Sequence, residues 1–352
     1  MSENFWDKFN NGKLDRRTFV KAASLMGGAA VFGLPLIGCQ PATKTPAADI
    51  KMGSPSPMLQ VIMAHGAGGQ AAFAQEGVNN IITEFSGGGD QVRAVTTGAF
   101  PLSITSPTAG MSALEAGDPV RYIAGGYNAS GQGFLVRVDS PFKKPQDLKG
   151  KKIKLGYSRP GSNSHIVAFL GLKALGIDPN DKDQVEFIST GATPDTWTAV
   201  KSGIIDVGWS SEPTMSDVEL KGEGRVLWMT QDLGIGWVDI GIITTQNFVD
   251  SNTAQLKSWV NAYVKAVDWV KNHYTEAAKD LAQVMGVNIA VAEAAMKKVP
   301  KEVWSCSMPK KIMETMAQAS IDFKVLKAMP DWKVLINQSF LPENLRDPSY
   351  TA

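Results

Sequence analysis

The chain has 352 residues, a length typical of about two domains of roughly 150 residues each. Hydrophobic residues make up 43% and charged residues 20%, as in globular proteins with ordinary cores. The 35 Lys and Arg residues nearly balance the 34 Asp and Glu residues, which gives a formal net charge of +1. This balance argues against a nucleic-acid-binding protein, because such a protein needs a strongly basic surface.

Cysteine and histidine are too few for a disulfide framework or a typical metal centre. The two cysteines, Cys39 and Cys306, cannot supply a four-ligand zinc site. The three histidines lack metal-ligand spacing, and no Walker loop, Gly-x-Ser-x-Gly elbow or His-Glu-x-x-His motif occurs. We therefore expect no metal, no cofactor and no enzymatic activity.

The first 38 residues have the pattern of an export signal. Arg16 and Arg17 are followed by an apolar pair and a lysine, which is typical of twin-arginine export. The apolar stretch that follows ends in Leu-Ile-Gly before Cys39, a pattern similar to a lipobox. We expect cleavage before Cys39, a lipid on its sulfur that holds the protein on a membrane in the periplasm or at the cell surface, and a flexible tether over 39–57. The alternative is a single uncleaved membrane anchor.

Short apolar runs alternate with helical patterns after residue 58, which predicts an α/β architecture. The expected strands are 59–63, 92–95, 102–104, 121–124, 134–138, 152–156, 185–188, 205–209 and 240–244. A helix is expected over 164–175, and apolar residues at spacings of three and four predict long helices around 256–270 and 312–326. The C-terminal third is therefore expected to be helical.

A weak internal repeat suggests two similar units. Ser106-Pro107-Thr108 and Glu212-Pro213-Thr214 each follow an expected strand, and each has a leucine seven residues after its proline. The repeat predicts two similar α/β lobes.

Several longer segments match one family pattern. Residues 139–153 resemble its "DS…DLKGKKI" segment, 199–207 its "AL-x-SG-x-VDA" segment, and 222–226 its "G-x-GRVL" strand. Glu212-Pro213 resembles its "EP" turn. On these residues the chain resembles the periplasmic substrate-binding proteins of ABC importers, in the nitrate/sulfonate/taurine-type family, over roughly residues 59–336. The first glycine-rich loop and residues 98–101 depart from the pattern.

The resemblance implies a two-lobed periplasmic binding protein fold, type II-like, with a hinged cleft. Lobe one would be 58–136 plus 237–352, and lobe two 137–236. A monomer would capture a small anion or zwitterion, such as a sulfonate, nitrate, taurine or an organic carboxylate, and deliver it to an ABC permease and its ATPase. A binding protein of another importer class and a ligand-sensing lipoprotein stay open as alternatives.

The segment 156–165 joins an expected strand to a helix start. Unpaired N–H groups of a first helical turn, together with the positive end of the helix dipole, bind anions. Ser162, Asn163 and Ser164 could add further donors there, although one of them could simply be the N-cap. Arg159 is the charged partner in this loop, or an ordinary exposed arginine.

The remaining candidates lie in other expected turns. His65 and Gly66 belong to a glycine-rich turn that allows close backbone approach. The repeated turns are expected to face each other across the cleft, where Glu212 could contact ligand or hold the lobes together. Further ligand contacts are expected at three places. They are Thr105 and Ser106 in the first repeated turn, Tyr127 at a strand end, and Trp209, Trp237 and Asp239 near the crossover.

Overall fold

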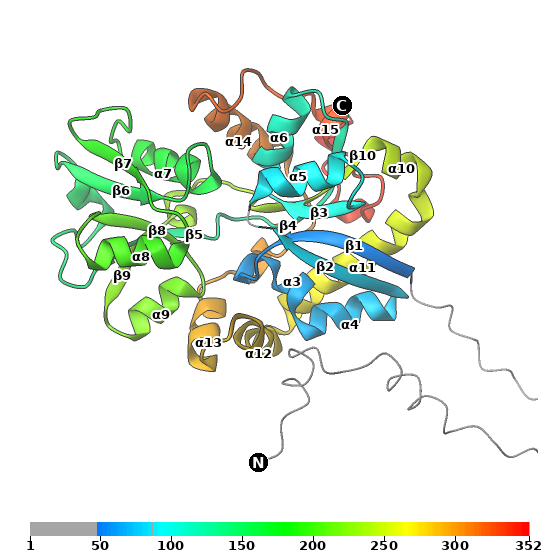
Figure 1. Ribbon diagram of the computed structural model, residues 1–352, viewed down its shortest axis with the longest axis horizontal. Coiled ribbons are helices and arrows are strands. Elements are labelled where there is room, and N and C mark those ends of the chain that lie inside the picture. The colour runs from blue at the N-terminus through cyan, green and yellow to red at the C-terminus, as the bar shows by residue number, and fades with distance from the viewer. Residues whose placement is uncertain (1–47, 86, 352) are drawn as a thin grey trace, which may run out of the picture. The chain divides into compact units, whose positions relative to one another are not determined.

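The computed structural model describes residues 48–85 and 87–351. The expected export signal and the expected lipid on Cys39 lie outside these residues. Within them, the α/β prediction is confirmed, because two five-stranded mixed sheets are each accompanied by helices (Figure 1). Within the same ranges, no helix has the length and apolar character needed to cross a membrane.

The first sheet has the strand order β2-β1-β3-β10-β4. β1 pairs in parallel with β2 and β3, and β10 runs antiparallel to β3 and β4. The strands are β1 (Ala48–Pro55), β2 (Val78–Phe85), β3 (Leu102–Thr105), β4 (Val120–Tyr127) and β10 (Ile240–Thr245).

The second sheet has the order β7-β6-β8-β5-β9 and repeats this pattern. β6 pairs in parallel with β7 and β8, and β5 runs antiparallel to β8 and β9. In each sheet the antiparallel strand is the first one after the chain arrives from the other sheet, so the predicted similarity of the two units is confirmed. The strands are β5 (Gln132–Arg137), β6 (Ile153–Tyr157), β7 (Val185–Ser189), β8 (Val207–Ser211) and β9 (Gly224–Met229).

The chain passes between the sheets twice. It leaves the first sheet after Tyr127 and enters the second at Gln132, and it returns between Met229 and Ile240. The predicted lobe boundary after residue 136 therefore falls inside β5, which pairs only with strands of the second sheet in the described ladders. The resemblance placed the return at residue 237, within the observed crossover.

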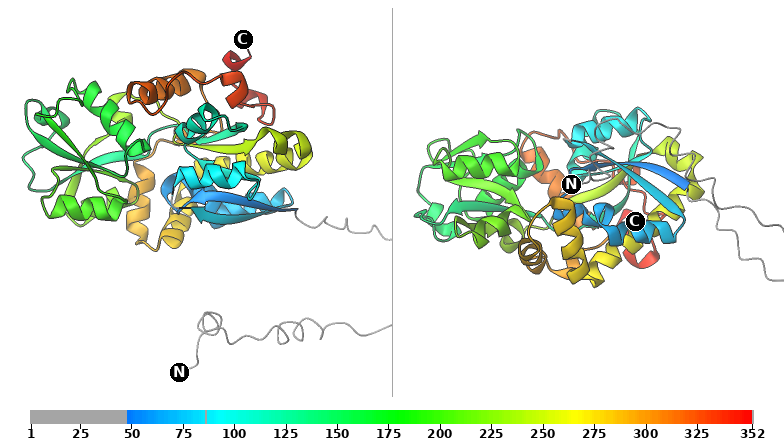
Figure 2. Two further views of the ribbon diagram at one scale, coloured as in Figure 1. Left: turned by 45° about the horizontal axis from the view of Figure 1, so that its top comes forward. Right: turned by 60° about the horizontal axis from the view of Figure 1, so that its bottom comes forward.

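Helices surround both sheets, and the chain beyond β10 is largely helical, as predicted (Figure 2). The α-helices are α3 (Ile62–His65), α4 (Ala67–Gln75), α5 (Gly88–Thr96), α6 (Pro107–Glu115), α7 (Asn163–Ala174), α8 (Thr193–Lys201), α9 (Thr214–Leu220), α10 (Gln246–Ser251), α11 (Thr253–Asn272), α12 (Tyr274–Met285), α13 (Ile289–Lys297), α14 (Lys310–Asp322) and α15 (Trp332–Leu335). The 3-10 turns are η1 (Leu59–Val61), η2 (Pro145–Leu148), η3 (Thr230–Leu233), η4 (Lys301–Val303), η5 (Glu343–Leu345) and η6 (Pro348–Tyr350).

The prediction for the first strand is wrong. Residues 59–63 form η1 and the start of α3, whereas residues 48–55, expected to be tether, form β1. The glycine in β1 makes the segment look like a linker, but it allows β1 to pack closely against β3. A Cβ on Gly53 would lie 2.5 Å from Ser103 Oγ. The apolar run at 59–63 is buried on every side, and a short buried run of this kind does not distinguish strand from helix.

The second correction concerns residues 92–95, expected to be a strand. They lie inside α5, where Val92 and Val95 are buried three residues apart and Arg93 is exposed. The strand before α5 is β2, which the sequence did not predict. Its alternation of buried and exposed residues is regular only over Val78–Ile81, so the strand pattern is short.

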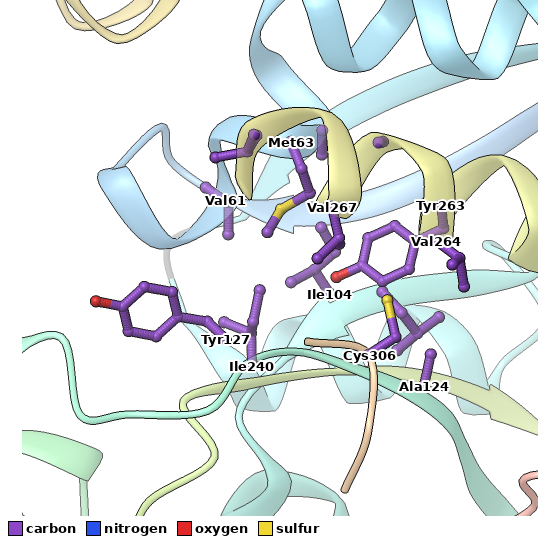
Figure 3. Packing of buried hydrophobic residues seen from close by; sticks show 14 of the residues in the cluster. Val61, Met63, Ile104, Ala124, Tyr127, Ile240, Tyr263, Val264, Val267 and Cys306 are labelled. Atoms are coloured by element: carbon purple, nitrogen blue, oxygen red, sulfur yellow. The ribbon is translucent and has the colours of Figure 1, made fainter. Parts of the chain in front are cut away.

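The core of the first sheet is packed against α11. Tyr263, Val264 and Val267 of α11 lie over Ile104 and Ala124 of the sheet (Figure 3). The sulfur of Cys306 points toward the ring of Tyr263, and burial raises the pKa of this thiol (Figure 3). Cys306 is thus a core residue.

Candidate functional site

The candidate site is centred on Asp239, in the return crossover just before β10. Asp239 is 7% exposed, and its Oδ1 accepts a hydrogen bond of 2.7 Å from Asn163 Nδ2 at the start of α7. Its backbone N–H donates to the carbonyl of Tyr127 at 2.9 Å, at the end of β4. Asp239 therefore connects both sheets to the crossover between them.

The surroundings of Asp239 form a compact polar group, here called the Asp239 cluster, which consists of Gln60, Tyr127, Gly131, Asn163, Trp237 and Asp239. Burial raises the pKa of the Asp239 carboxyl to about 6, and donors on Asn163, Gly131, Gln60 and Trp237 oppose that rise. Trp237 Nε1 faces the carboxylate without reaching hydrogen-bond geometry. A carboxyl group of this kind titrates close to neutral pH.

Tyr127, at the end of β4, is buried and lies close to the Asp239 carboxyl. Its hydroxyl points away from the hydrophobic cluster of the first sheet (Figure 3). Burial, with the nearby charges of Asp239 and Glu212, raises the pKa of Tyr127 well above its usual value. The structure thus brings together five of the residues expected from the sequence: Tyr127, Asn163, Glu212, Trp237 and Asp239.

Glu212, in the turn after β8, is held by one ion pair and one hydrogen bond. Its Oε1 lies 3.1 Å from Lys298 Nζ, an ion pair outside hydrogen-bond angles, and its Oε2 accepts from the backbone N–H of Ser216 at 3.0 Å. Lys298 follows α13, and sequence reasoning missed it because nothing in its local pattern marks a partner far along the chain. Of the two roles expected for Glu212, contacting ligand or holding the lobes together, these contacts favour the second.

The loop before α7, here called the serine loop (residues 158–164), uses its serine hydroxyls in hydrogen bonds to one another. The hydroxyl of Ser158 lies 2.7 Å from Ser164 Oγ and 2.9 Å from Ser162 Oγ, and these last two are 3.0 Å apart. Ser162 is the N-cap of α7, with its hydroxyl accepting from the N–H of His165. Each serine hydroxyl already has a partner, and Asn163 Nδ2 is engaged with Asp239.

His65 and Gly66 lie at the junction of α3 and α4. His65 Nε2 is 2.9 Å from Ser54 Oγ of β1, and burial lowers the pKa of this imidazole. A Cβ on Gly66 would lie 2.7 Å from Asp280 Oδ2 of α12, so the glycine allows helix packing. Their described hydrogen bonds do not connect these residues to the Asp239 cluster.

Ser106 is the N-cap residue of α6. Its carbonyl accepts a hydrogen bond of 2.5 Å from the hydroxyl of Tyr122, and its Oγ lies 3.0 Å from Thr108 Oγ1. Trp209 is half-buried in β8, opposite Phe134 of β5. Both residues therefore have local packing or hydrogen-bonding partners of their own.

Several buried polar atoms around the carboxyl ends of the strands have no hydrogen-bond partner among the described residues. They are Thr105 Oγ1, Gln132 Oε1, Asn163 Oδ1, Trp209 Nε1, Ser210 Oγ, Ser216 Oγ and Trp237 Nε1. Buried polar groups are nearly always paired, so water or a polar solute near these atoms would complete their hydrogen bonding. In α/β sheets ligands bind at this end of the strands.

Two cavities lie outside the Asp239 cluster. One of 540 Å³ lies between α7 and α14 and is bordered by Lys173 and Ile312. The other, of 510 Å³, lies between α5 and α6 and begins at Gly89, in the first turn of α5. The second reaches a helix start that the sequence did not single out, because β2 before it was not predicted.

Residues 69–277, more than half of the chain, match the family model described as NMT1/THI5 like. The chain belongs to the NMT1/THI5-like family. A Bacillus subtilis relative, provisionally named aliphatic sulfonates-binding protein, is 22% identical over 86% of this chain and 89% of its own length. The resemblance to nitrate/sulfonate/taurine-type binding proteins is thus confirmed.

Solved structures share the fold of this NMT1/THI5-like chain. The periplasmic aliphatic sulphonate-binding protein SsuA of Escherichia coli superposes with a TM-score of 0.69 at 18% identity, covering 84% of this chain and 93% of SsuA. SsuA of Xanthomonas axonopodis, bound to MOPS, gives 0.65 at 17% identity, with 80% and 95% covered. The desulfurization enzyme DszB gives 0.63 at 16% identity, with 83% and 97% covered, so the same fold also carries catalysis. The prediction of a periplasmic binding protein fold is confirmed.

Proposed function

We propose that this protein is an extracytoplasmic solute-binding protein that captures a small anion of the sulfonate class and delivers it to an ABC permease. The observation that carries the proposal is the set of buried, unpaired polar atoms at the carboxyl ends of β3 and β8 and at the start of α7. Their mixture of amide, hydroxyl and indole groups suits a small polar solute. The names of its relatives supply the solute class.

Binding would work by hinge closure. The two sheets, with their helices, act as lobes, and the crossovers 128–131 and 230–239 are the segments that bend. The Asp239 cluster lies on the return crossover, so a solute held beside it contacts both lobes. A closed, loaded form then differs from the open form in the surface it offers to a permease.

The proposal includes export by the twin-arginine route and a lipid on Cys39, on the sequence patterns described above. It is a proposal of binding rather than catalysis, although DszB shares the fold. Neighbouring permease and ATPase genes would support it, whereas a neighbouring sensor kinase would favour the sensing alternative.

A thermal-shift screen tests the proposal. The chain from residue 40 onward, which keeps β1, would be heated with ethanesulfonate, MOPS, taurine, nitrate and benzoate. A ligand present at 100 times its dissociation constant adds about 2.7 kcal/mol to the free energy of unfolding, which is easily measured. Stabilisation by at least one sulfonate is expected. No stabilisation by any of these anions, with no binding in calorimetric titration, would contradict the proposal.

A further inference from the structure

The start of α5 is an uncapped helix N-terminus with glycine at its N-cap and first two helical positions, and its first turn also carries the exposed Asp90. Gly87 is the N-cap residue and makes no side-chain capping bond, and Gly88 and Gly89 open the helix. First-turn N–H groups have no partner inside a helix, and the positive end of the dipole lies there. A Cβ on Gly89 would meet nothing within 4 Å, so the backbone is open to an approaching group.

A second observation points to a ligand at the same place. Thr105, at the end of β3, is 2% exposed, and its Oγ1 has no hydrogen-bond partner among the described residues. This hydroxyl lies 3.0 Å from the position that a Cβ on Gly88 would take. The unpaired hydroxyl therefore faces the first turn of α5, where a side chain on residue 88 would displace it.

A positive charge from the other sheet approaches this helix start. Arg159, in the loop after β6, has its Nη1 3.8 Å from the position of a Cβ on Gly87. None of the ion pairs found among residues 48–85 and 87–351 includes Arg159. A guanidinium group, a hydroxyl and free backbone amides are the donors that bind a compact oxyanion.

The serine loop competes poorly for the same anion. Its three hydroxyls bond to one another within 3.0 Å, and the side-chain donor of Asn163 is occupied by Asp239. An anion there would have to break these contacts, whereas the start of α5 offers donors without partners.

We propose that the sulfonate group of the solute is bound at the start of α5, by the amides of Gly88 and Gly89 and the hydroxyl of Thr105, with Arg159 closing over it from the second sheet. This inference rests on the proposed function, since it names the part of the site that holds the charged group. Residues from both sheets then contact one group, which couples binding to closure.

Calorimetric titration with ethanesulfonate and MOPS tests this assignment in the chain from residue 40 onward. Thr105→Val keeps the shape of the side chain and removes the hydroxyl, and Arg159→Met removes an exposed charge. Each is expected to raise Kd roughly 10- to 100-fold, the usual effect of losing a hydrogen bond to a charged group. Thr105→Ser and Arg159→Lys should recover part of the affinity.

Two controls separate binding from folding. Arg93→Met removes an exposed charge further along α5 and should leave Kd unchanged. The unliganded Thr105→Val variant should melt at the same temperature as the parent or above it, because a buried hydroxyl without a partner does not stabilise the fold. A lower melting temperature with unchanged affinity would give Thr105 a structural role and overturn its place in the site.

The outcomes distinguish this inference from the proposed function. If the parent binds ethanesulfonate or MOPS and both variants bind as tightly, the start of α5 is not the anion site, while the proposed function stands. If the parent binds neither sulfonate, the inference fails at its premise. Weaker binding by Thr105→Val and Arg159→Met, but not by Arg93→Met, supports it.

Discussion

Lys298 Nζ lies 3.1 Å from Glu212 Oε1, and this ion pair joins the end of α13 to the turn after β8. The same ammonium group donates to Glu219 Oε2 of α9 at 2.7 Å. Since the side chain of Glu212 is only 3% exposed, its charge is balanced by a residue nearly ninety positions later in the chain. The hydrogen bond from Asn163 to Asp239 likewise connects the second-sheet unit to the return crossover, and an ion pair of Lys173 with Asp322 connects α7 to α14.

Replacing Lys298 by Met should destabilise the protein, because Glu212 is left buried without a counter-charge. Removing one partner of a fully buried pair costs about 3–5 kcal/mol, and the one-third exposure of Lys298 reduces the expected loss to about 1–3 kcal/mol. Urea denaturation measures it. Glu212→Gln in the Lys298→Met background should recover much of the loss, and equal losses with and without Glu212 would show that the pair is uncoupled.

Asp239 should make stability depend on pH in an unusual direction. Burial raises its pKa from 3.8 to about 6, so the folded protein binds this proton more tightly than the unfolded chain. The charged carboxylate therefore opposes folding above pH about 6, by about 3 kcal/mol, and the penalty disappears as pH falls toward 4. Asp239→Asn should stabilise the protein relative to the parent more at pH 7.5 than at pH 4.5.

Denaturation curves across this pH range check the prediction, with Asp147→Asn as the control. Backbone N–H groups of Lys144 and Lys143 lower the pKa of Asp147 from its usual 3.8, so this carboxyl is ionised in both the folded and the unfolded protein between pH 4.5 and 7.5. The difference in stability between Asp147→Asn and the parent should therefore stay nearly constant over this range. A difference between Asp239→Asn and the parent that does not change with pH would contradict the burial of a titrating carboxyl.

Export should depend on the paired arginines and anchoring on Cys39. Because a receptor reads the arginines, Arg16→Lys combined with Arg17→Lys should leave the protein in the cytoplasm. Cys39→Ala should abolish lipid attachment and leave the precursor unprocessed or released. Fractionation of the host cells with metabolic lipid labelling measures both. Processed, membrane-bound protein in equal amounts from both variants would contradict the assignment.

The sequence predicted the parts of the fold whose patterns are local and regular. The strands around 153–157, 185–189 and 240–245 match expectation because each is a short apolar run, and α11 matches because its helical spacing of apolar residues is regular. β1 was missed because Gly53 and two prolines nearby look like a linker, although the glycine is needed for close packing of strands. The local sequence pattern contains no information about contacts between strands that are distant in the chain.

The same limit applies to the candidate site. Asn163 and Asp239 could be singled out because they flank a helix start and a crossover, but their hydrogen bond joins positions 76 residues apart. Lys298 carries no local signal at all. The glycines at 87–89 do have one, a strand-to-helix turn rich in glycine, and recognising β2 would have revealed it.

The placement of β1 predicts that residues before 58 are required for folding. A chain that begins at residue 58 lacks the strand between β2 and β3, so it should show no cooperative unfolding transition, whereas a chain that begins at residue 40 should. Within the full chain, Gly53→Val should cost about 1–3 kcal/mol, because its Cβ would overlap Ser103 Oγ. Circular dichroism with urea denaturation measures both, and a stable protein beginning at residue 58 would contradict the assignment of β1.

The serine loop gives the last prediction, because the contacts seen there oppose the role expected from the sequence. Ser162→Ala removes the N-cap of α7 and should cost about 1 kcal/mol of stability. Ser164→Ala breaks the hydroxyl triangle and the bond from the N–H of Ser158. If the anion lies at α5, both variants should bind ethanesulfonate as tightly as the parent. If Ser164→Ala instead binds about tenfold more weakly with unchanged stability, the serine loop holds the anion, as the sequence predicts.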